Sequence, residues 1–270
     1  MTFTHALRLT GLAALALLAA CGGGGGGGGT PPTPTYTVTF VAGTGGTLTG
    51  STTQTITSGG NATAVTAVPN SGYTFTNWTG TNFTTSTANP LTVSSVTQNL
   101  TITANFTFQP ATSLAYTDPT TGTYQLKKNT TLSTSTHLVL DLVGPSATTG
   151  CGVTAVFTAD TTRVSWVNVA STDTAGTYVQ NGTAFTLGSG TQILRGKLAS
   201  GTLSVIAAQK GVASPVALNA PLLRIALDLK AGTAPTGTAT LTSDNTKAQV
   251  LNADGTTSTI AVTVGTLAAQ

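Results

Sequence analysis

The chain has 270 residues and a formal net charge of +3, yet Asp, Glu, Lys and Arg together make up only 6% of it, and glutamate is absent. Globular domains usually contain about 25% charged residues, and the few scattered cations argue against a nucleic-acid surface. Beyond residue 20, the apolar residues stand singly between Thr, Ser, Asn and Gly, and no run approaches the roughly 20 apolar residues that cross a bilayer. Thr suits a pleated strand because its branched side chain packs well there. The composition therefore predicts an all-β protein.

The first 20 residues have the layout of a secretory signal. One cation, Arg8, precedes an apolar run from Leu9 to Ala20 that is too short to span a bilayer. The run ends in Leu18-Ala19-Ala20-Cys21, and such a site resembles the lipobox of bacterial lipoproteins. This resemblance implies cleavage before Cys21 and a lipid on Cys21 that anchors the chain to a membrane of the cell envelope. Gly22 resembles the residue found there in lipoproteins of the Gram-negative outer membrane. The alternative is an ordinary secretory signal with a chance cysteine.

Residues 21–35 are interpreted as the lipidated cysteine and its tether. Glycine occupies residues 22–29, and Pro31, Pro32 and Pro34 follow. Polyglycine is a flexible coil and proline stiffens a chain, so the tether would hold the first folded module on the order of 20 Å from the anchor.

A first module is expected over residues 36–108, because no charged residue occurs there, while all seven aspartates lie from Asp118 onward. Alternating apolar and polar residues, and turn residues between them, predict strands at 36–42, 62–68, 73–78, 91–96 and 100–108. Trp78 and Tyr73 could stack on a sugar ring. A Trp in so small a module more often fills the interior, and we expect it in the core.

Two stretches of this module carry a resemblance. Residues 62–78 read ATAVTAVPNSGYTFTNW and residues 100–106 read LTITANF. They resemble the divergent internalin-type B repeat of bacterial surface proteins. The resemblance implies a small β-grasp-like module without catalytic activity, of the kind used as a spacer or interaction unit.

Residues 109–131 are predicted to connect the modules, with a first edge strand at Tyr124-Gln125-Leu126. Residues 132–270 form short strands with turn signals between them, which is typical of a β-sandwich. Hairpin turns are predicted at Asn181-Gly182 and Asp254-Gly255. In the strand at 223–230, four apolar residues alternate with Arg224, Asp228 and Lys230, so we expect one buried and one solvated face.

The second module also carries a resemblance. Its residues are 153–157 (VTAVF) leading to Asp160, then 164–169 (VSWVNV), 223–229 (LRIALDL), 237–241 (GTATL) and the last strand, 260–264. In order and spacing they resemble the cohesin-type, carbohydrate-binding-like jelly-roll β-sandwich. The resemblance implies binding of a protein or a polysaccharide. The chain has no acidic calcium loop of the dockerin type, so dockerin is not predicted as the partner.

Chemistry-bearing residues are few. His137 begins a predicted strand and shares a face with Asp141, and the two could form a charge-assisted pair. A satisfied surface histidine is the preferred interpretation. Cys151, between two glycines, is expected to be a small buried residue. No catalytic residue, metal-ligand set or cofactor motif is predicted, and the ligand-binding residues stay unassigned.

These observations favour a non-catalytic, lipid-anchored cell-envelope protein, in which a β-grasp-like module precedes a cohesin-like sandwich that binds protein or polysaccharide. The alternative is a structural, self-assembling surface spacer without a soluble ligand, because uncharged strand edges do little to discourage pairing between sheets. The expected partners are a membrane, through the lipid on Cys21, and one such ligand, but no nucleic acid.

Overall fold

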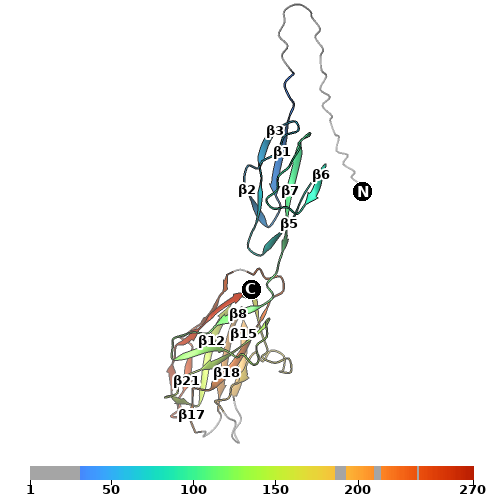
Figure 1. Ribbon diagram of the computed structural model, residues 1–270. Helices are drawn as coiled ribbons and strands as arrows, with labels where there is room; N and C mark the ends of the chain where they lie inside the picture. The colour runs from blue at the N-terminus through green and yellow to red at the C-terminus, as the bar shows by residue number, and fades with distance from the viewer. Residues whose placement is uncertain (1–30, 186–192, 210–213, 236) are drawn as a thin grey trace, which may run out of the picture. The chain divides into compact units, whose positions relative to one another are not determined.

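The computed structural model describes residues 31–185, 193–209, 214–235 and 237–270. The signal, Cys21 and most of the tether lie outside these residues. Every regular element of the described part is a strand (Figure 1), so the prediction of an all-β chain is confirmed. The described residues contain no helix with the length and hydropathy needed to cross a bilayer.

The first module is built on one five-stranded sheet with the order β3-β1-β7-β5-β6. These strands are β1 (Thr35–Ala42), β3 (Thr53–Thr57), β5 (Tyr73–Gly80), β6 (Phe83–Ser86) and β7 (Leu100–Phe108). β1 and β7 pair in parallel, and the other neighbours are antiparallel. A second pair consists of β2 (Gly46–Thr49) and β4 (Thr66–Pro69). The strands predicted at 36–42, 73–78 and 100–108 are therefore present.

Trp78 lies at the centre of this module's core. Its side chain is fully buried, its indole N–H donates to the carbonyl oxygen of Ala88 at 2.9 Å, and its ring meets Phe40 edge-on at 5.8 Å. The core interpretation of Trp78 is confirmed. Tyr73 is half-buried and packs its ring against Phe108.

Two expected strands of this module differ. The strand predicted at 62–68 is reduced to β4, and segment 91–96 forms only one isolated bridge, between Val65 and Leu91. The backbone of segment 91–96 bonds to the irregular stretch 59–65, including Gly59 and Gly60, rather than to a neighbouring strand. A regular strand needs a neighbouring strand to pair with, and segment 91–96 has only this irregular stretch beside it.

The second module has two main sheets. The first contains β13 (Val164–Val167), β18 (Pro221–Leu229), β10 (His137–Val143), β9 (Tyr124–Lys128) and β23 (Val262–Val264) in that order, with β14 (Gln180–Asn181) also paired to β18. The second contains β15 (Ile193–Ala199), β16 (Thr202–Ala208), β12 (Gly152–Ala159), β21 (Gln249–Leu251) and β22 (Thr257–Thr259), with β20 (Leu241–Ser243) paired to β12.

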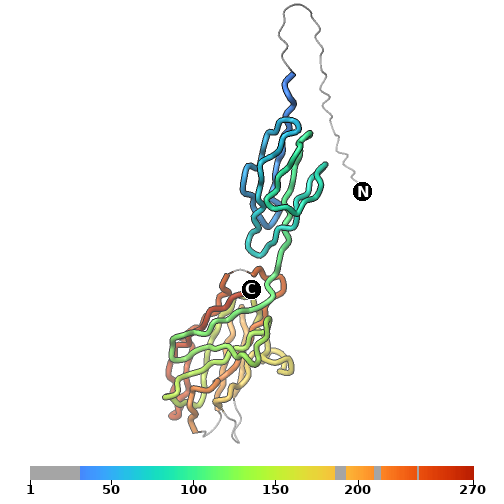
Figure 2. The backbone as a smooth tube through the Cα atoms, viewed as in Figure 1, coloured from blue at the N-terminus to red at the C-terminus, as the bar shows by residue number. Residues whose placement is uncertain are grey.

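Smaller sheets complete this module. One consists of β19 (Thr238–Ala239), β24 (Thr266–Ala269) and β8 (Leu114–Thr117), and the other of β11 (Thr149–Gly150) and β17 (Val216–Ala217). Figure 2 shows the green segment that contains β8 beside the red C-terminal segment that contains β24, and the two strands pair.

A single apolar core lies between the sheets. It includes Leu138, Leu140 and Leu142 of β10, alternate residues of β18, Phe157 of β12, and Leu203, Val205 and Ala207 of β16. Trp166 is 6% exposed and donates its indole N–H to the carbonyl oxygen of Gly201 at 2.8 Å. The alternation in these strands therefore predicted the inward faces correctly.

The strand predicted at Tyr124-Gln125-Leu126 is not at an edge. β9 lies between β10, to which it is antiparallel, and β23, to which it is parallel. Residues 114–128, which we placed in the connecting segment, thus pair with strands from the end of the chain. Local sequence could not indicate this, because the partner β23 lies more than a hundred residues away.

The hairpin predicted at Asn181-Gly182 is wrong. Asn181 pairs with Leu223 of β18, and neither residue has a positive φ. A Cβ atom on Gly182 would lie 1.8 Å from the carbonyl oxygen of Pro221, so glycine is needed there for close approach of two backbones. The hairpin at Asp254-Gly255 is confirmed, because it joins β21 to β22 and Gly255 has a φ of +83°.

Candidate functional site

The outward face of the first sandwich sheet is covered. Val139 of β10 and Ala226 of β18 point away from the main core but are fully buried, because Val167 and Val169 pack over them. The expectation that this face of β18 is solvated is therefore wrong around Ala226. The reason is that the segment after β13 folds back across the sheet and brings its own apolar side chains.

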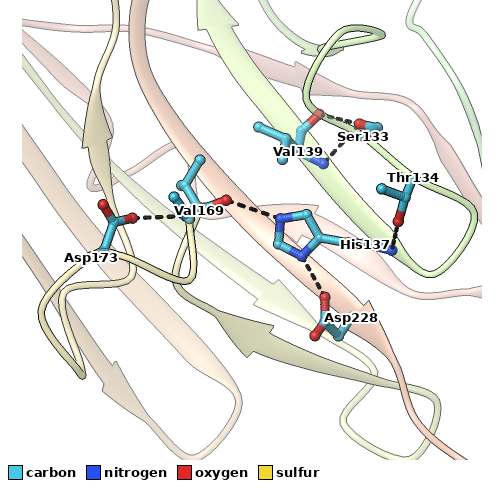
Figure 3. A network of polar contacts seen from close by, with 8 residues as sticks. Ser133, Thr134, His137, Val139, Val169, Asp173 and Asp228 are labelled. Carbon is cyan, nitrogen blue, oxygen red and sulfur yellow. Dashed lines mark hydrogen bonds and ion pairs between the residues drawn. The ribbon is translucent and has the colours of Figure 1, made fainter.

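His137 fastens this covering segment to the sheet. Its Nδ1 lies 2.6 Å from Oδ1 of Asp228 on β18, and its Nε2 lies 3.0 Å from the carbonyl oxygen of Val169 (Figure 3). A carbonyl oxygen only accepts, so Nε2 carries a proton. Nδ1 lies at hydrogen-bond distance from the Asp228 carboxyl group. Neither ring nitrogen is left to accept a proton from a substrate, which matches the predicted role of a satisfied histidine.

The alternative that we did not prefer, a pair between His137 and Asp141, does not form. The two residues do share a face of β10, but four positions along a strand separate them by about 13 Å. Asp141 instead accepts from Nε of Arg224 at 2.8 Å and from Nδ2 of Asn129 at 2.8 Å. Its exposed fraction is 8%, so this is a largely buried, fully used carboxylate.

The outward face of the second sandwich sheet is open. Side chains on this face form two rows across β15, β16 and β12. In one row Arg195 lies opposite Ile206, and Ile206 lies opposite Thr154. In the other row Lys197 lies opposite Ser204, and Ser204 lies opposite Val156. We call these six residues the open face. Between them is a shallow hollow of about 270 Å³. All six side chains are half-buried or exposed, whereas side chains on the covered face of the first sandwich sheet include fully buried ones.

Charge on the open face comes from one strand. Arg195 and Lys197 are exposed on the outer side of β15, and neither forms an ion pair within the described residues. Ile206 and Val156 contribute an apolar strip beside them. Two cations next to an apolar strip suit a partner that presents anionic groups around an apolar contact.

Sequence reasoning missed these two cations. The signal was the run Ile193–Ala199, ILRGKLA, in which Arg195 and Lys197 alternate with Leu194, Gly196 and Leu198. Period-2 alternation placed the cations on one side, but only the pairing of β15 with β16 shows which other residues share that side.

Three of the remaining carboxylates serve turns. Asp160, Asp244 and Asp254 each accept from the backbone N–H and the hydroxyl of the Thr two residues later. The hydrogen bond from Lys247, together with those from Thr246, lowers the pKa of Asp244 to about 2. The hydrogen bonds from the Thr residues also lower the pKa of Asp160 and of Asp254. Within the described residues, no three His, Cys or carboxylate side chains gather in a way that could hold a metal ion.

Only one of the two cysteines lies within the described residues. Cys21 lies outside the described residues. Cys151 is half-buried rather than buried, and its backbone bonds to Leu251 and Gln209, which ties the start of β12 to β21 and to the end of β16.

Residues 36–110 match the model of the divergent InlB B-repeat domain. The resemblance expected for the first module is therefore confirmed. No curated protein matches the chain.

Solved structures similar to the chain include cohesin modules. A type II cohesin domain from the cellulosome of Acetivibrio cellulolyticus has 14% identity and a TM-score of 0.43, with coverage of 55% of this chain and 95% of that one. A cohesin module from a Clostridium perfringens family 33 glycoside hydrolase has 11% identity and a TM-score of 0.33, covering 58% and 99%. The sixth cohesin of A. cellulolyticus scaffoldin B, solved in complex with a Cel5 dockerin mutant, has 12% identity and a TM-score of 0.37, covering 48% and 86%. The expected cohesin resemblance thus recurs among solved structures, but at these values it says nothing about a ligand.

Proposed function

We propose that this chain is a non-catalytic, lipid-anchored protein of the bacterial cell envelope whose C-terminal sandwich binds a protein or a polysaccharide. The observation that carries the proposal is the contrast between the two outer faces of the sandwich. One is covered by the segment that contains Val169, while the open face exposes Arg195 and Lys197 beside Ile206 and Val156. An exposed sheet face with two cations and a small apolar strip can contact a partner without rearrangement.

The anchoring part of the proposal rests on the lipobox-like sequence that ends at Cys21 and on the glycine tether after it. A lipid at Cys21 would hold both modules at a membrane, and Gly22 favours the outer membrane. A flexible tether would let the open face meet partners in many orientations.

The experiment reverses the charge of the open face. The Arg195→Glu, Lys197→Glu double variant and the full-length chain are each immobilised and exposed to envelope proteins and polysaccharides from the source cell. Because charges at the rim of an interface steer association, we expect the double variant to bind the partner at least tenfold more weakly than the unaltered chain does. The matched control is Lys127→Glu, Lys128→Glu, which makes the same charge change on the other sheet. Equal binding by both variants, or no partner for the unaltered chain, contradicts the proposal.

A second candidate function is self-assembly into a surface layer or spacer. Its support is the absence of charged side chains on three edge strands. These are β3 and β6, at the two edges of the first module's sheet, and β22, at one edge of the second sandwich sheet. Edge strands normally carry charges that discourage pairing with other chains. Sedimentation at increasing concentration distinguishes the two functions, because assembly predicts growing particles, whereas a strict monomer that captures a partner favours binding.

A further inference from the structure

A groove of about 530 Å³ lies in the first module, between β6 and segment 91–98. Its volume is within the range of roughly 300–1,000 Å³ that is typical of ligand sites. It belongs to a different module from the open face. We call it the hydroxyl groove, because most of the exposed side chains that line it are those of Thr and Ser.

Both walls of the hydroxyl groove are held in place from behind. Backbone hydrogen bonds join Leu91 to Val65 at 2.8 Å, Ala62 to Val93 at 2.8 Å and Val96 to Gly60 at 2.9 Å. On the other side, β6 pairs with β5, and the indole of Trp78 holds the following turn at Ala88. The amide of Asn89 bonds both the N–H and the carbonyl of Ala67 at 2.8 Å. A groove with fixed walls binds a ligand without paying for their ordering.

Two lining residues have an uncommon backbone. Ser95 has a φ of +54° and Asn82 a φ of +59°. Asn adopts this region readily, but Ser does so rarely. The N–H of Ser95 donates to Oδ1 of Asn61 at 3.0 Å, which stabilises this conformation. Such outliers concentrate at ligand-binding positions.

The chemistry of the groove is neutral and polar above an apolar floor. The hydroxyl groups of Thr84, Thr85, Thr92 and Ser94 form no hydrogen bond within the part of the chain that the structure describes, so they are available to a ligand. Half-buried Phe83 and several buried aliphatic side chains line the same groove. No charged residue occurs between residues 35 and 108.

We propose that the hydroxyl groove binds a neutral oligosaccharide, a site separate from the open face. A charged ligand would lose hydration there without gaining an opposite charge. A neutral sugar exchanges its hydrogen bonds to water for bonds to the Thr and Ser hydroxyls, and the apolar face of its ring can rest on Phe83. The occupant is therefore a chain of uncharged sugar units rather than an acidic glycan.

The test uses the full chain and a panel of hexasaccharides: β-1,4-linked glucose, β-1,3-linked glucose and β-1,4-linked mannose, with hexagalacturonate as the acidic comparison. The groove variant is Thr92→Arg with Ser94→Arg, at exposed positions whose change leaves the core intact. The control is Thr55→Arg with Thr57→Arg on β3, which adds the same charge at exposed positions outside the groove. Circular dichroism confirms that each variant is folded.

We expect at least one neutral hexasaccharide to bind the unaltered chain. The groove variant should bind that sugar at least tenfold more weakly, and the control should bind it with unchanged affinity. Binding of none of the three neutral sugars overturns the proposal, as does stronger binding of hexagalacturonate. Equal affinity in the groove variant and the control also overturns it. Sugar binding that is lost in Arg195→Glu, Lys197→Glu but kept in the groove variant supports the open face instead.

Discussion

His137 Nδ1 lies 2.6 Å from Asp228 Oδ1, although 91 residues separate the two in sequence. The side chains are 25% and 45% exposed. Because the other ring nitrogen donates to the carbonyl oxygen of Val169, this single side chain joins β10, β18 and the segment that covers their outer face. The covering segment therefore depends on His137 as well as on the small apolar cluster beneath it.

Replacing His137 by Ala should loosen the covering segment. The change removes two hydrogen bonds, one of them to a carboxyl group, and we expect a loss of about 2 kcal/mol in the free energy of unfolding. Hydrogen exchange of the amides between Val169 and Thr174 should become faster, while exchange in β16 stays slow. Asp228→Asn keeps an acceptor opposite Nδ1 and should have a smaller effect. Unchanged exchange in His137→Ala would mean that the valines alone hold the segment.

The ion pairs of Asp141 and Asp244 should differ in their contribution to stability. Asp141 is nearly buried and leaves both Arg224 and Asn129 without an acceptor when it is replaced, so Asp141→Ala should lower the free energy of unfolding by about 3 kcal/mol. Asp244 pairs with Lys247, whose side chain is 67% exposed, and Asp244→Ala should change stability far less. Urea unfolding of the two variants measures the difference, and similar losses would contradict the ranking.

Tyr116 should make the fold sensitive to high pH. Burial raises its pKa from 10.0 to about 12, although the N–H of Gly265 bonds its oxygen at 2.7 Å; its own hydroxyl donates to Leu126 at 2.7 Å. A raised pKa means that the folded state holds the proton longer than the unfolded state does, so this stability is complete below pH 10 and is lost between pH 10 and 12. The loss is about 2–3 kcal/mol.

Tyr116→Phe, which has no proton to lose, should show a shallower decline of unfolding free energy between pH 10 and 12. The comparison is with the unaltered chain, because Tyr124, whose pKa is also raised by burial, is present in both proteins. Parallel declines would show that Tyr116 is not responsible.

Cys21 should decide where the protein is found in the cell. If a lipid is attached there, Cys21→Ala moves the protein from the membrane fraction to the soluble fraction, because a tether alone has no affinity for a bilayer. Cys151→Ala is the matched control and should remain with the membranes. Sedimentation of Cys21→Ala with the membranes would exclude the proposed anchor.

Local sequence was enough to predict that the elements are strands and which side of several strands faces the core. Alternation placed Leu138, Leu140 and Leu142 inward, because side-chain direction in a strand follows from local periodicity and burial follows from hydrophobicity. The core position of Trp78 was predicted from its size, since a Trp in so small a module usually fills the interior. Local sequence likewise predicted the turn at Asp254-Gly255, whose geometry depends on adjacent residues only.

Which strands are neighbours, and with that which residues form the candidate sites, became known only from the folded chain. His137 bonds to Asp228 instead of Asp141, and β9 lies between β10 and β23. Gly182 allows two backbones to approach closely instead of forming a turn. The open face and the hydroxyl groove likewise combine residues from separate segments. Pairing across a sheet joins residues that are distant in sequence, so local periodicity, which reports one strand at a time, contains no record of it.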